Sequence, residues 1–315
     1  MLVSFIIPHK GRTELLEQTL QSIANLEFDQ TELEVIIVTQ NNTLDDLKHE
    51  NTQFHLQTIF QPGDKTISAL RNVGVRHASG EYLVFLDADI QLSPNWLHVM
   101  FDELDQHPDR VLVSAIQQCA PEAGIIEQIR VILNNTAADS TVQFLDGRDL
   151  FLKRSIFEKA GGFPEHLVTC EDYYFTNTVH QQGELYFTSK ASYIHLGEDK
   201  SYAEMFRKEI WRGQSNLQSM RGRKIILREL PSFFMPLWQG VLLLLSIISL
   251  GIAQIDFAFF SLVISCLPIV LYTLRLYGIG KGRIQFLDAL HFYSIYFPAR
   301  TIGTIIGLFK VVNIS

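Results

Sequence analysis

The chain has 315 residues, a net charge of −8 and a hydrophobic fraction of 47%, enough for one large domain or two smaller ones. It carries no basic stripe or basic tail, which argues against nucleic-acid binding. The three cysteines, Cys119, Cys170 and Cys266, are widely spaced without a CxxC pair, so we expect free thiols in a reducing compartment rather than a disulfide framework.

Over roughly the first 200 residues, short unbroken apolar runs alternate with segments whose apolar residues recur at helical spacing. The expected strands cover residues 3–7, 34–39, 57–62, 82–86, 111–115, 149–153, 186–189 and 192–195. The expected helices cover residues 13–25, 67–78, a segment ending at 161–162, and 170–182. This alternation predicts an α/β fold with a mostly parallel, doubly wound sheet flanked by helices.

The strand expected at 82–86 leads directly into two carboxylates, in the stretch EYLVFLDADIQLSPNWL. In an open α/β sheet, ligands bind beyond the carboxyl ends of the strands. Asp87 and Asp89 lie on the same side of an extended chain, because residues i and i+2 share a side. Such a pair suits magnesium or manganese, which also takes substrate phosphates as ligands. From this triplet alone, a solvated loop or a helix cap explains the acids equally well.

A second acidic pair, Glu171 and Asp172, stands at the start of the helix expected at 170–182. A carboxylate placed there can accept a proton from a reacting hydroxyl. The simpler alternative is that both acids stabilise the positive end of the helix dipole.

After residue 235 the composition changes to two uncharged runs, 236–255 and 257–274, separated by Asp256. Each run is long enough to cross the roughly 30 Å hydrocarbon core as a helix, so we expect a membrane hairpin rather than a buried hairpin of a soluble protein. Basic residues flank both ends of this pair: Arg221, Arg223, Lys224 and Arg228 before it, and Arg275, Lys281 and Arg283 after it. The positive-inside rule therefore places the preceding domain on the cytoplasmic face of an inner membrane.

A third segment, residues 289–312, contains Pro298 and Arg300 near its middle. Because an arginine at the bilayer centre is costly, we expect an interfacial or broken helix here rather than a third span. The expected domains are thus 1–220, carrying the chemistry, and 221–315, associated with the membrane.

Several blocks of the chain resemble successive blocks of family 2 glycosyltransferases, which have the GT-A fold. They are VSFIIPHKGRTELLEQTLQSI, LEVIIVTQNN, ALRNVGVRHASGEYLVFLDADIQLSPNWL and GGFPEHLVTCEDYYFTNTVHQQG. The resemblance covers roughly residues 1–200. It implies transfer of a sugar from a nucleotide donor with inversion, assisted by a divalent cation.

The resemblance also implies a role for individual residues. Asp87, Asp89 and His195 would hold the metal on the donor diphosphate, or His195 would contact the diphosphate itself. Asp172 would be the base, with Glu171 assisting or orienting it. The implied donor-binding residues are Pro8, Gln40, Asn41, Arg71, Asn72 and Asp87. For Arg71 a surface helix charge, and for His195 a structural role, are the alternatives.

The chain also departs from the family pattern. The second strand ends in VTQNN where acidic residues as in VDDGS are common, and Pro8 is followed by HKG rather than TYN. Gln40 and Asn41 are neutral but still able to hydrogen-bond a base. The Q-x-x-R-W motif of processive synthases is absent, with only EIWRGQSN in its region, which favours a single transfer over polymer synthesis.

We therefore expect an inverting glycosyltransferase that moves one sugar from a UDP- or GDP-sugar to a hydroxyl of a lipid-linked or envelope glycan acceptor. One alternative is a polyprenyl-phosphate sugar synthase, whose phosphate acceptor needs little general base. Another is a non-catalytic subunit that binds a sugar nucleotide during assembly, which the altered VTQNN end motivates.

Overall fold

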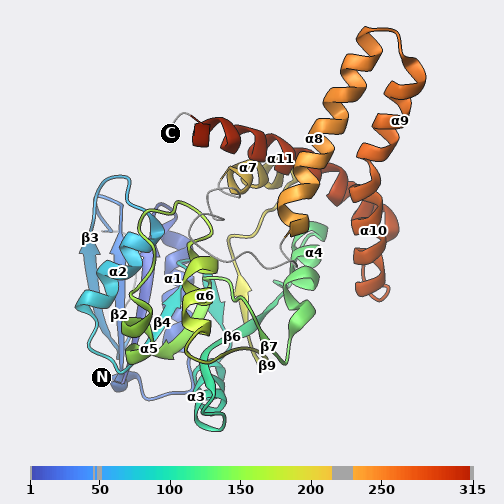
Figure 1. Cartoon of the computed structure of the whole chain (residues 1–315). Coiled ribbons are helices and arrows are strands. Elements are labelled where there is room, and N and C mark those ends of the chain that lie inside the picture. Colours follow the sequence, from blue (N-terminus) through green and yellow to red (C-terminus); the bar gives the residue numbers. More distant parts are fainter. Residues whose placement is uncertain (1, 45–46, 48–51, 215–229, 313–315) are drawn as a thin grey trace. The chain divides into compact units, whose positions relative to one another are not determined.

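A computed structural model describes residues 2–44, 47, 52–214 and 230–312 (Figure 1). The chain divides into two compact units. The sheet unit comprises Met1–Glu122 and Asn134–Glu198, and the helical unit comprises Ala123–Leu133 and Asp199–Ser315. The domain boundary expected at residue 220, and the basic residues Arg221 to Arg228, lie outside the described residues.

The described part of the sheet unit is built on a nine-stranded sheet with the order β3-β2-β1-β4-β8-β6-β9-β5, and β7 pairs with β9. The strands are β1 Val3–His9, β2 Leu33–Thr39, β3 His55–Phe60, β4 Tyr82–Leu86, β5 Ile90–Leu92, β6 Arg110–Gln118, β7 Ser140–Val142, β8 Asp149–Lys153 and β9 Glu184–His195. Strands β1 to β4 pair with one another in parallel, and β6 is parallel to β9. Strand β8 is antiparallel to both β4 and β6. The sheet is therefore mixed. The apolar runs in the sequence predict where its strands lie but not their direction.

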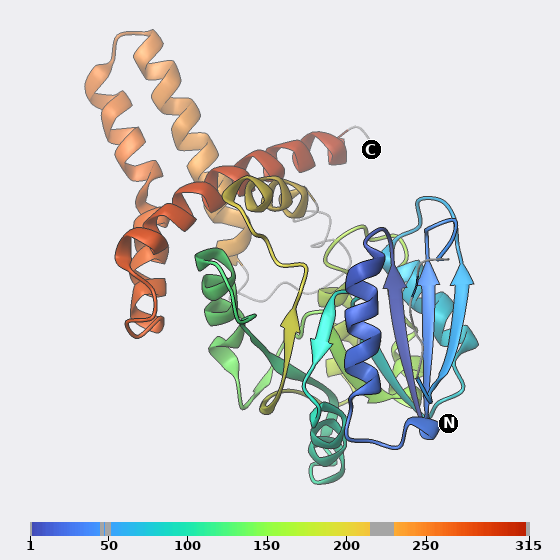
Figure 2. The same cartoon turned by 180° about the vertical axis from the view of Figure 1, so that it is seen from behind.

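Helices cover both faces of this sheet: α1 Thr13–Ala24, α2 Ile67–His77, α3 Trp96–Asp105, α5 Arg154–Ala160 and α6 Glu171–His180. Phe5 and Ile7 of β1 share a core with α1 and α3, whereas Ile6 and Phe85 share a core with α2, α5 and α6. Figure 1 shows α2 and α6 on the near face, and Figure 2 shows α1 on the opposite one. Strands buried on both faces read as continuous apolar runs, which is why the sequence identifies β1, β2 and β4.

The helical unit contains most of α4 Ile125–Asn134, and α7 Tyr202–Gly213, α8 Leu230–Gly251, α9 Ile255–Ser265, α10 Leu267–Ile279 and α11 Phe286–Val312. Ile129 of α4, Met205 of α7, Leu276 of α10 and Phe292 of α11 are buried in one core. Neither α4 nor α7 was expected from the sequence. Both carry a local signal all the same, since α4 has Ile125, Ile129 and Ile132 at helical spacing and α7 begins with a capping box between Ser201 and Glu204.

Two segments of the described chain, Phe234–Gly251 and Ile255–Ile279, are long and apolar enough to cross a membrane. Only 17% and 28% of their residues are buried, and Ile247 and Phe259 are among the exposed large side chains. The core hairpin of a soluble protein would be mostly buried. The Ser246 hydroxyl on α8 donates to the Ala258 carbonyl on α9 (2.8 Å), so the two helices pack as a hairpin (orange in Figure 1). The second segment is divided at Cys266, with Pro268 in the first turn of α10.

The third C-terminal segment forms one continuous helix, α11, which includes Pro298. Of the two alternatives expected here, an interfacial or a broken helix, the broken one is therefore absent. Arg300 does not face apolar surroundings, because its Nε lies 2.5 Å from Glu209 Oε2 on α7. This ion pair keeps the arginine inside the helical unit and gives the charge a partner. An interfacial position for α11 stays a prediction.

Candidate functional site

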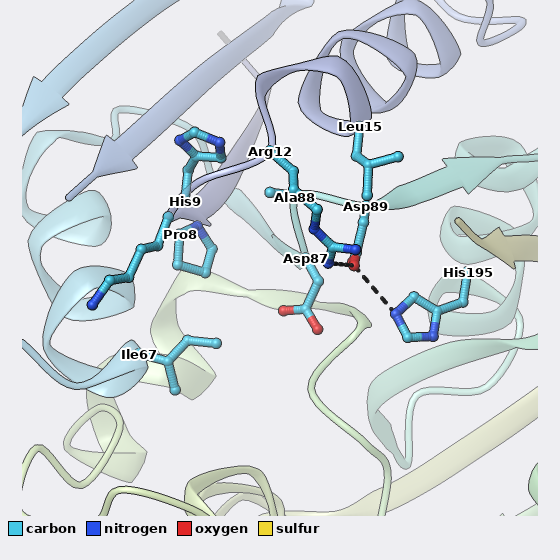
Figure 3. Close-up of a pocket in the computed structure, with 10 residues that line it drawn as sticks. Pro8, His9, Arg12, Leu15, Ile67, Asp87, Ala88, Asp89 and His195 are labelled. Atoms are coloured by element: carbon cyan, nitrogen blue, oxygen red, sulfur yellow. Dashed lines mark hydrogen bonds and ion pairs between the residues drawn. The ribbon is translucent and has the colours of Figure 1, made fainter. Parts of the chain in front are cut away.

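An open pocket of about 210 Å³ lies at the carboxyl ends of β1 and β4 (Figure 3). The two strands are parallel neighbours, so the residues that follow them emerge side by side. The lining residues are Pro8, His9, Lys10, Arg12, Leu15, Ile67, Asp87, Ala88, Asp89 and His195. The structure thus brings together four residues singled out from the sequence, namely Pro8, Asp87, Asp89 and His195.

Asp89 is surrounded by cations. Its Oδ2 accepts a hydrogen bond from Arg12 Nη2 (3.2 Å) and lies 3.4 Å from His195 Nε2. The other ring nitrogen of His195, Nδ1, lies 3.0 Å from Glu198 Oε2. The pairing of β5 with β9 brings Asp89 next to His195, because Ile90, the residue after Asp89, is opposite His195. Figure 3 shows the Asp89 carboxylate turned towards His195, while the Asp87 carboxylate points into the pocket.

These contacts shift the pKa values of both side chains. Burial alone would lower the pKa of His195, but the hydrogen bonds to Asp89 and Glu198 outweigh it and raise this pKa to about 9. Burial would raise the pKa of Asp89, yet His195 and the Arg12 charge lower it. Asp89 and His195 therefore form a charged pair at neutral pH.

Arg71 joins the two acidic pairs. It is 1% exposed, so the alternative of a surface helix charge is wrong. Its Nη2 donates to Asp87 Oδ1 (2.9 Å) and to the Gly147 carbonyl (2.7 Å), and its Nη1 donates to Glu171 Oε1 (3.3 Å). One guanidinium on α2 therefore connects the end of β4 with the start of α6. The pKa of Asp87 is nevertheless raised, because burial outweighs the charge of Arg71.

Asp172 lies in the first turn of α6, and its Oδ1 accepts a hydrogen bond from the Tyr173 amide (2.7 Å). The preceding residue, Cys170, has a left-handed backbone with φ of 63°. Burial, followed by the negative charges of Glu171 and Asp146, raises the pKa of Asp172 to about 7. A carboxylate that titrates near neutral pH is well matched to general-base work. Asp172 is not among the residues lining the pocket of Figure 3.

The side-chain amides of Gln40 and Asn41, predicted to bind the donor, form hydrogen bonds with backbone groups. Gln40 Nε2 donates to the carbonyls of Gly63 (2.7 Å) and Lys65 (2.9 Å). Asn41 exchanges two hydrogen bonds with the backbone of Gly11, accepting at 2.8 Å and donating at 3.1 Å. Both side chains thus fix loops next to the β1 end, and neither lines the pocket.

Asn72 has a similar bracing role. Its Nδ2 donates to the Phe163 carbonyl (2.9 Å) and its Oδ1 accepts from the Phe163 amide (3.0 Å). The preceding Gly162 has φ of 84°, and a Cβ there would lie 3.0 Å from Asn72 Oδ1. Glycine is therefore required at this position both for its backbone conformation and for the close approach.

The described residues contain no group of three His, Cys, Asp or Glu side chains arranged as a ready metal cage. Asp87 gives one oxygen to Arg71, and Asp89 is engaged by Arg12 and His195. Two carboxylates lining one pocket still match magnesium or manganese, which commonly binds one or two protein carboxylates together with substrate phosphates and water. The donor set fits a cation that arrives with a diphosphate.

Some charged residues of the site were missed by sequence reasoning. Arg12 pairs with Asp89, and Glu198 orients His195. Arg148 Nη1 lies 3.5 Å from Asp146 Oδ2 and donates to the Tyr193 hydroxyl (3.2 Å). The spacing of Glu198, three residues after His195, was a usable signal. No local pattern in the sequence points to Arg12 or Arg148, because their partners depend on how strands and loops pack.

Comparison with known proteins identifies the family of this chain. The family model described as glycosyl transferase family 2 matches residues 4–161. The chain is 23% identical over 245 residues to glycosyltransferase AglE of Haloferax volcanii, covering 75% of the chain and 79% of that protein. It is 22% identical over 226 residues to poly(ribitol-phosphate) beta-N-acetylglucosaminyltransferase TarS of Staphylococcus aureus, covering 66% of the chain but only 36% of TarS.

Two solved structures share the fold. Mannosyltransferase PcManGT from Pyrobaculum calidifontis, in complex with GDP-Man and Mn²⁺, aligns with a TM-score of 0.63 at 16% identity, covering 96% of this chain and 86% of that one. S. aureus TarS 1–349 in complex with UDP-GlcNAc aligns with a TM-score of 0.51 at 19% identity, covering 95% and 90%. At these identities the likeness establishes the GT-A-like fold and nothing finer.

Proposed function

Because the chain belongs to glycosyl transferase family 2 and is a glycosyltransferase, we propose that it transfers one sugar, with inversion, from a nucleotide-diphosphate sugar to a hydroxyl of a lipid-linked or envelope glycan acceptor. The observation that carries this proposal is the Arg71 guanidinium, which contacts both Asp87 and Glu171. It holds a candidate donor-phosphate site and a candidate base segment in one rigid framework, and such positioning is a large part of catalysis of transfer.

On the donor side, Asp87 and Asp89 would hold a manganese or magnesium ion at the diphosphate. His195, protonated in its pair with Asp89, would contact the diphosphate as a cation, or would serve as a third ligand after losing its proton. When bound, the ion offsets the negative charge that develops on the leaving nucleoside diphosphate. Pro8 lines the donor pocket. Relatives bind a UDP-sugar and a GDP-sugar, and both donor classes suit this proposal.

The neighbouring amides have supporting parts in the donor site. Gln40, Asn41 and Asn72 shape it through the loops they hold. We assign Arg71 a positioning role instead of the phosphate contact expected from the sequence, because its Nη groups are already engaged by Asp87, Glu171 and Gly147.

On the acceptor side, Asp172 removes the proton of the acceptor hydroxyl as its oxygen attacks the anomeric carbon. The bond from that carbon to the diphosphate oxygen breaks, and the electron pair leaves with the nucleoside diphosphate. Inversion requires base and leaving group on opposite faces of the sugar. Glu171, held by Arg71, orients the first turn of α6 and so the position of Asp172.

The apolar hairpin of α8, α9 and α10 would anchor the enzyme at the cytoplasmic face of an inner membrane. Its exposed side chains support this proposal, as do Arg275 near the end of α10 and Lys281 and Arg283 just after it. Anchoring raises the effective concentration of a lipid-linked acceptor at the site.

The test is Asp172→Asn, which removes the base while keeping the shape of the side chain. We expect transfer to a sugar hydroxyl to fall by about 10²- to 10⁴-fold, with donor binding unchanged in a thermal-shift titration of nucleotide sugars with manganese. Asp102→Asn, an exposed site on α3, is the matched control. Full activity of Asp172→Asn would contradict the proposal. Retained transfer to a polyprenyl phosphate alone would establish the phosphate-acceptor alternative instead.

A further inference from the structure

Two aromatic rings are stacked next to the proposed base. The ring centroids of Phe144 and Tyr173 are 5.2 Å apart, with an interplanar angle of 25°. Tyr173 follows Asp172 in α6, and its amide donates to the Asp172 carboxylate (2.7 Å). Phe144 is 37% exposed. A partly exposed aromatic pair therefore includes the residue that follows the proposed base in the chain.

The loop that carries Phe144 is tied to the catalytic framework. It joins β7 to β8, and its Gly147 carbonyl accepts a hydrogen bond from Arg71 (2.7 Å). A Cβ at Gly147 would lie 2.8 Å from Arg71 Nη2, so the loop approaches the guanidinium as closely as glycine permits. In the same loop, the charge of Asp146 contributes to the raised pKa of Asp172. The aromatic pair is thus held in place relative to Asp172.

The charges around this aromatic pair favour a neutral ligand. Asp146, Glu171 and Asp172 all belong to the two segments that carry the ring pair. Arg71 pairs with Glu171 and Arg148 with Asp146, but the charges of Glu171 and Asp146 outweigh that of Arg71 at Asp172. A phosphate brought against an ionised base among further carboxylates would be repelled. A pyranose ring is uncharged, with a C–H face suited to an aromatic ring and hydroxyls suited to carboxylate oxygens.

We propose that Phe144 and Tyr173 form an acceptor subsite that stacks against the pyranose ring of a neutral acceptor sugar and presents one of its hydroxyls to Asp172. This inference rests on the proposed function and adds to it the side chains that recognise the acceptor sugar. The acceptor is a sugar that already belongs to a glycan or glycolipid. The acceptor hydroxyl still attacks the anomeric carbon of the donor and still gives its proton to Asp172.

The experiment compares Phe144→Ala, Phe144→Leu and Phe144→Tyr in the full-length protein in detergent. The acceptors are a panel of alkyl glycosides and, separately, a polyprenyl phosphate. For the glycoside, we expect kcat/KM to fall at least about tenfold in Phe144→Ala, the scale of one aromatic contact. It falls less in Phe144→Leu, which keeps apolar area without a flat face, and stays near wild type in Phe144→Tyr. Donor KM stays constant in all three variants.

Binding is measured independently of turnover by saturation-transfer NMR of the glycosides with nucleoside diphosphate and magnesium, which is diamagnetic, present. Contact of the ring C–H protons in the wild type, and its loss in Phe144→Ala, would support the subsite. Unchanged glycoside transfer in Phe144→Ala, exclusive transfer to the polyprenyl phosphate, or no glycoside contact in the wild type would each overturn it. If the wild type bound no nucleotide-sugar donor, that result would instead count against the proposed function, so the two failures are distinguishable.

Discussion

Each unit buries a cluster of arginine and carboxylate side chains, but in opposite proportions. In the sheet unit, one arginine, Arg71, is shared between Asp87 and Glu171. In the helical unit, one carboxylate, Glu209, faces three arginines: Arg130 (2.5 Å), Arg212 (2.7 Å) and Arg300 (2.5 Å).

The protonation equilibria of the two clusters differ accordingly. Burial would raise the pKa of Glu209, but the charges of Arg300, Arg130 and Arg212 lower it to about 2. In the sheet unit, the pKa values of Asp87 and Asp172 are both raised. Around Glu209, where arginines outnumber carboxylates, the carboxylate stays ionised and its ion pairs hold α4, α7 and α11 together. Around Arg71, where carboxylates outnumber arginines, a carboxylate is able to bind a metal cation or accept a proton.

The largest effect is expected for Glu209→Gln, which removes the carboxylate shared by three partly buried arginines and leaves only Arg130 with a second acidic partner, Asp199, among the ion pairs described. We expect the free energy of unfolding at neutral pH to fall by about 3 kcal/mol, the scale set by the lowered pKa of Glu209. Because its folded pKa is depressed, this stabilisation is present above its ordinary pKa of 4.5 and is lost as pH falls towards about 2. Thermal denaturation in detergent measures it, with the exposed Glu158→Gln as control. An unchanged melting temperature would show that the arginines do not depend on Glu209.

A second test weakens the shared cation of the sheet unit. Arg71→Lys keeps the charge but not the fork that reaches Asp87, Glu171 and Gly147 together. We expect kcat/KM for the donor to fall by about 100-fold, because misplacement of the two acidic pairs costs on this scale. Steady-state kinetics checks this value against Arg76→Lys, an exposed arginine on the same helix. Near-normal kinetics in Arg71→Lys would mean that the bridge is not needed for positioning.

The smallest expected effect is a shift in pH dependence. Since Asp172, as the proposed base, must be ionised to accept a proton and its pKa is about 7, kcat/KM should fall about tenfold per unit well below that pH. Asp146→Asn removes one of the charges that raise this pKa, so the acid limb should move to lower pH. Profiles of kcat/KM against pH for both proteins measure the shift. A limb that stays in place would show that another group controls it.

The predicted elements differ in how well they match the structure, for a physical reason. Strand β4 and the start of α2 coincide with the predicted boundaries, because buried strands and a Thr66-capped amphipathic helix are locally encoded. The short strand β5, with three residues, exists only through pairing with β9. In the region 117–141, where no helix or strand was expected from the sequence, the structure has α4, whose Ile126 and Ile129 are buried in the helical unit.

The sequence by itself determined the family, the position of Asp87 and Asp89 at a strand end, the acidic start of α6 and the two apolar helices. These features depend on local composition and motif spacing. The tertiary structure alone decided that Arg71 bridges Asp87 and Glu171, that His195 faces Asp89, that Arg300 pairs with Glu209 and that Phe144 stacks on Tyr173. Each of these contacts joins segments far apart in the chain. Its existence depends on strand register and helix packing, which no local pattern of residues records.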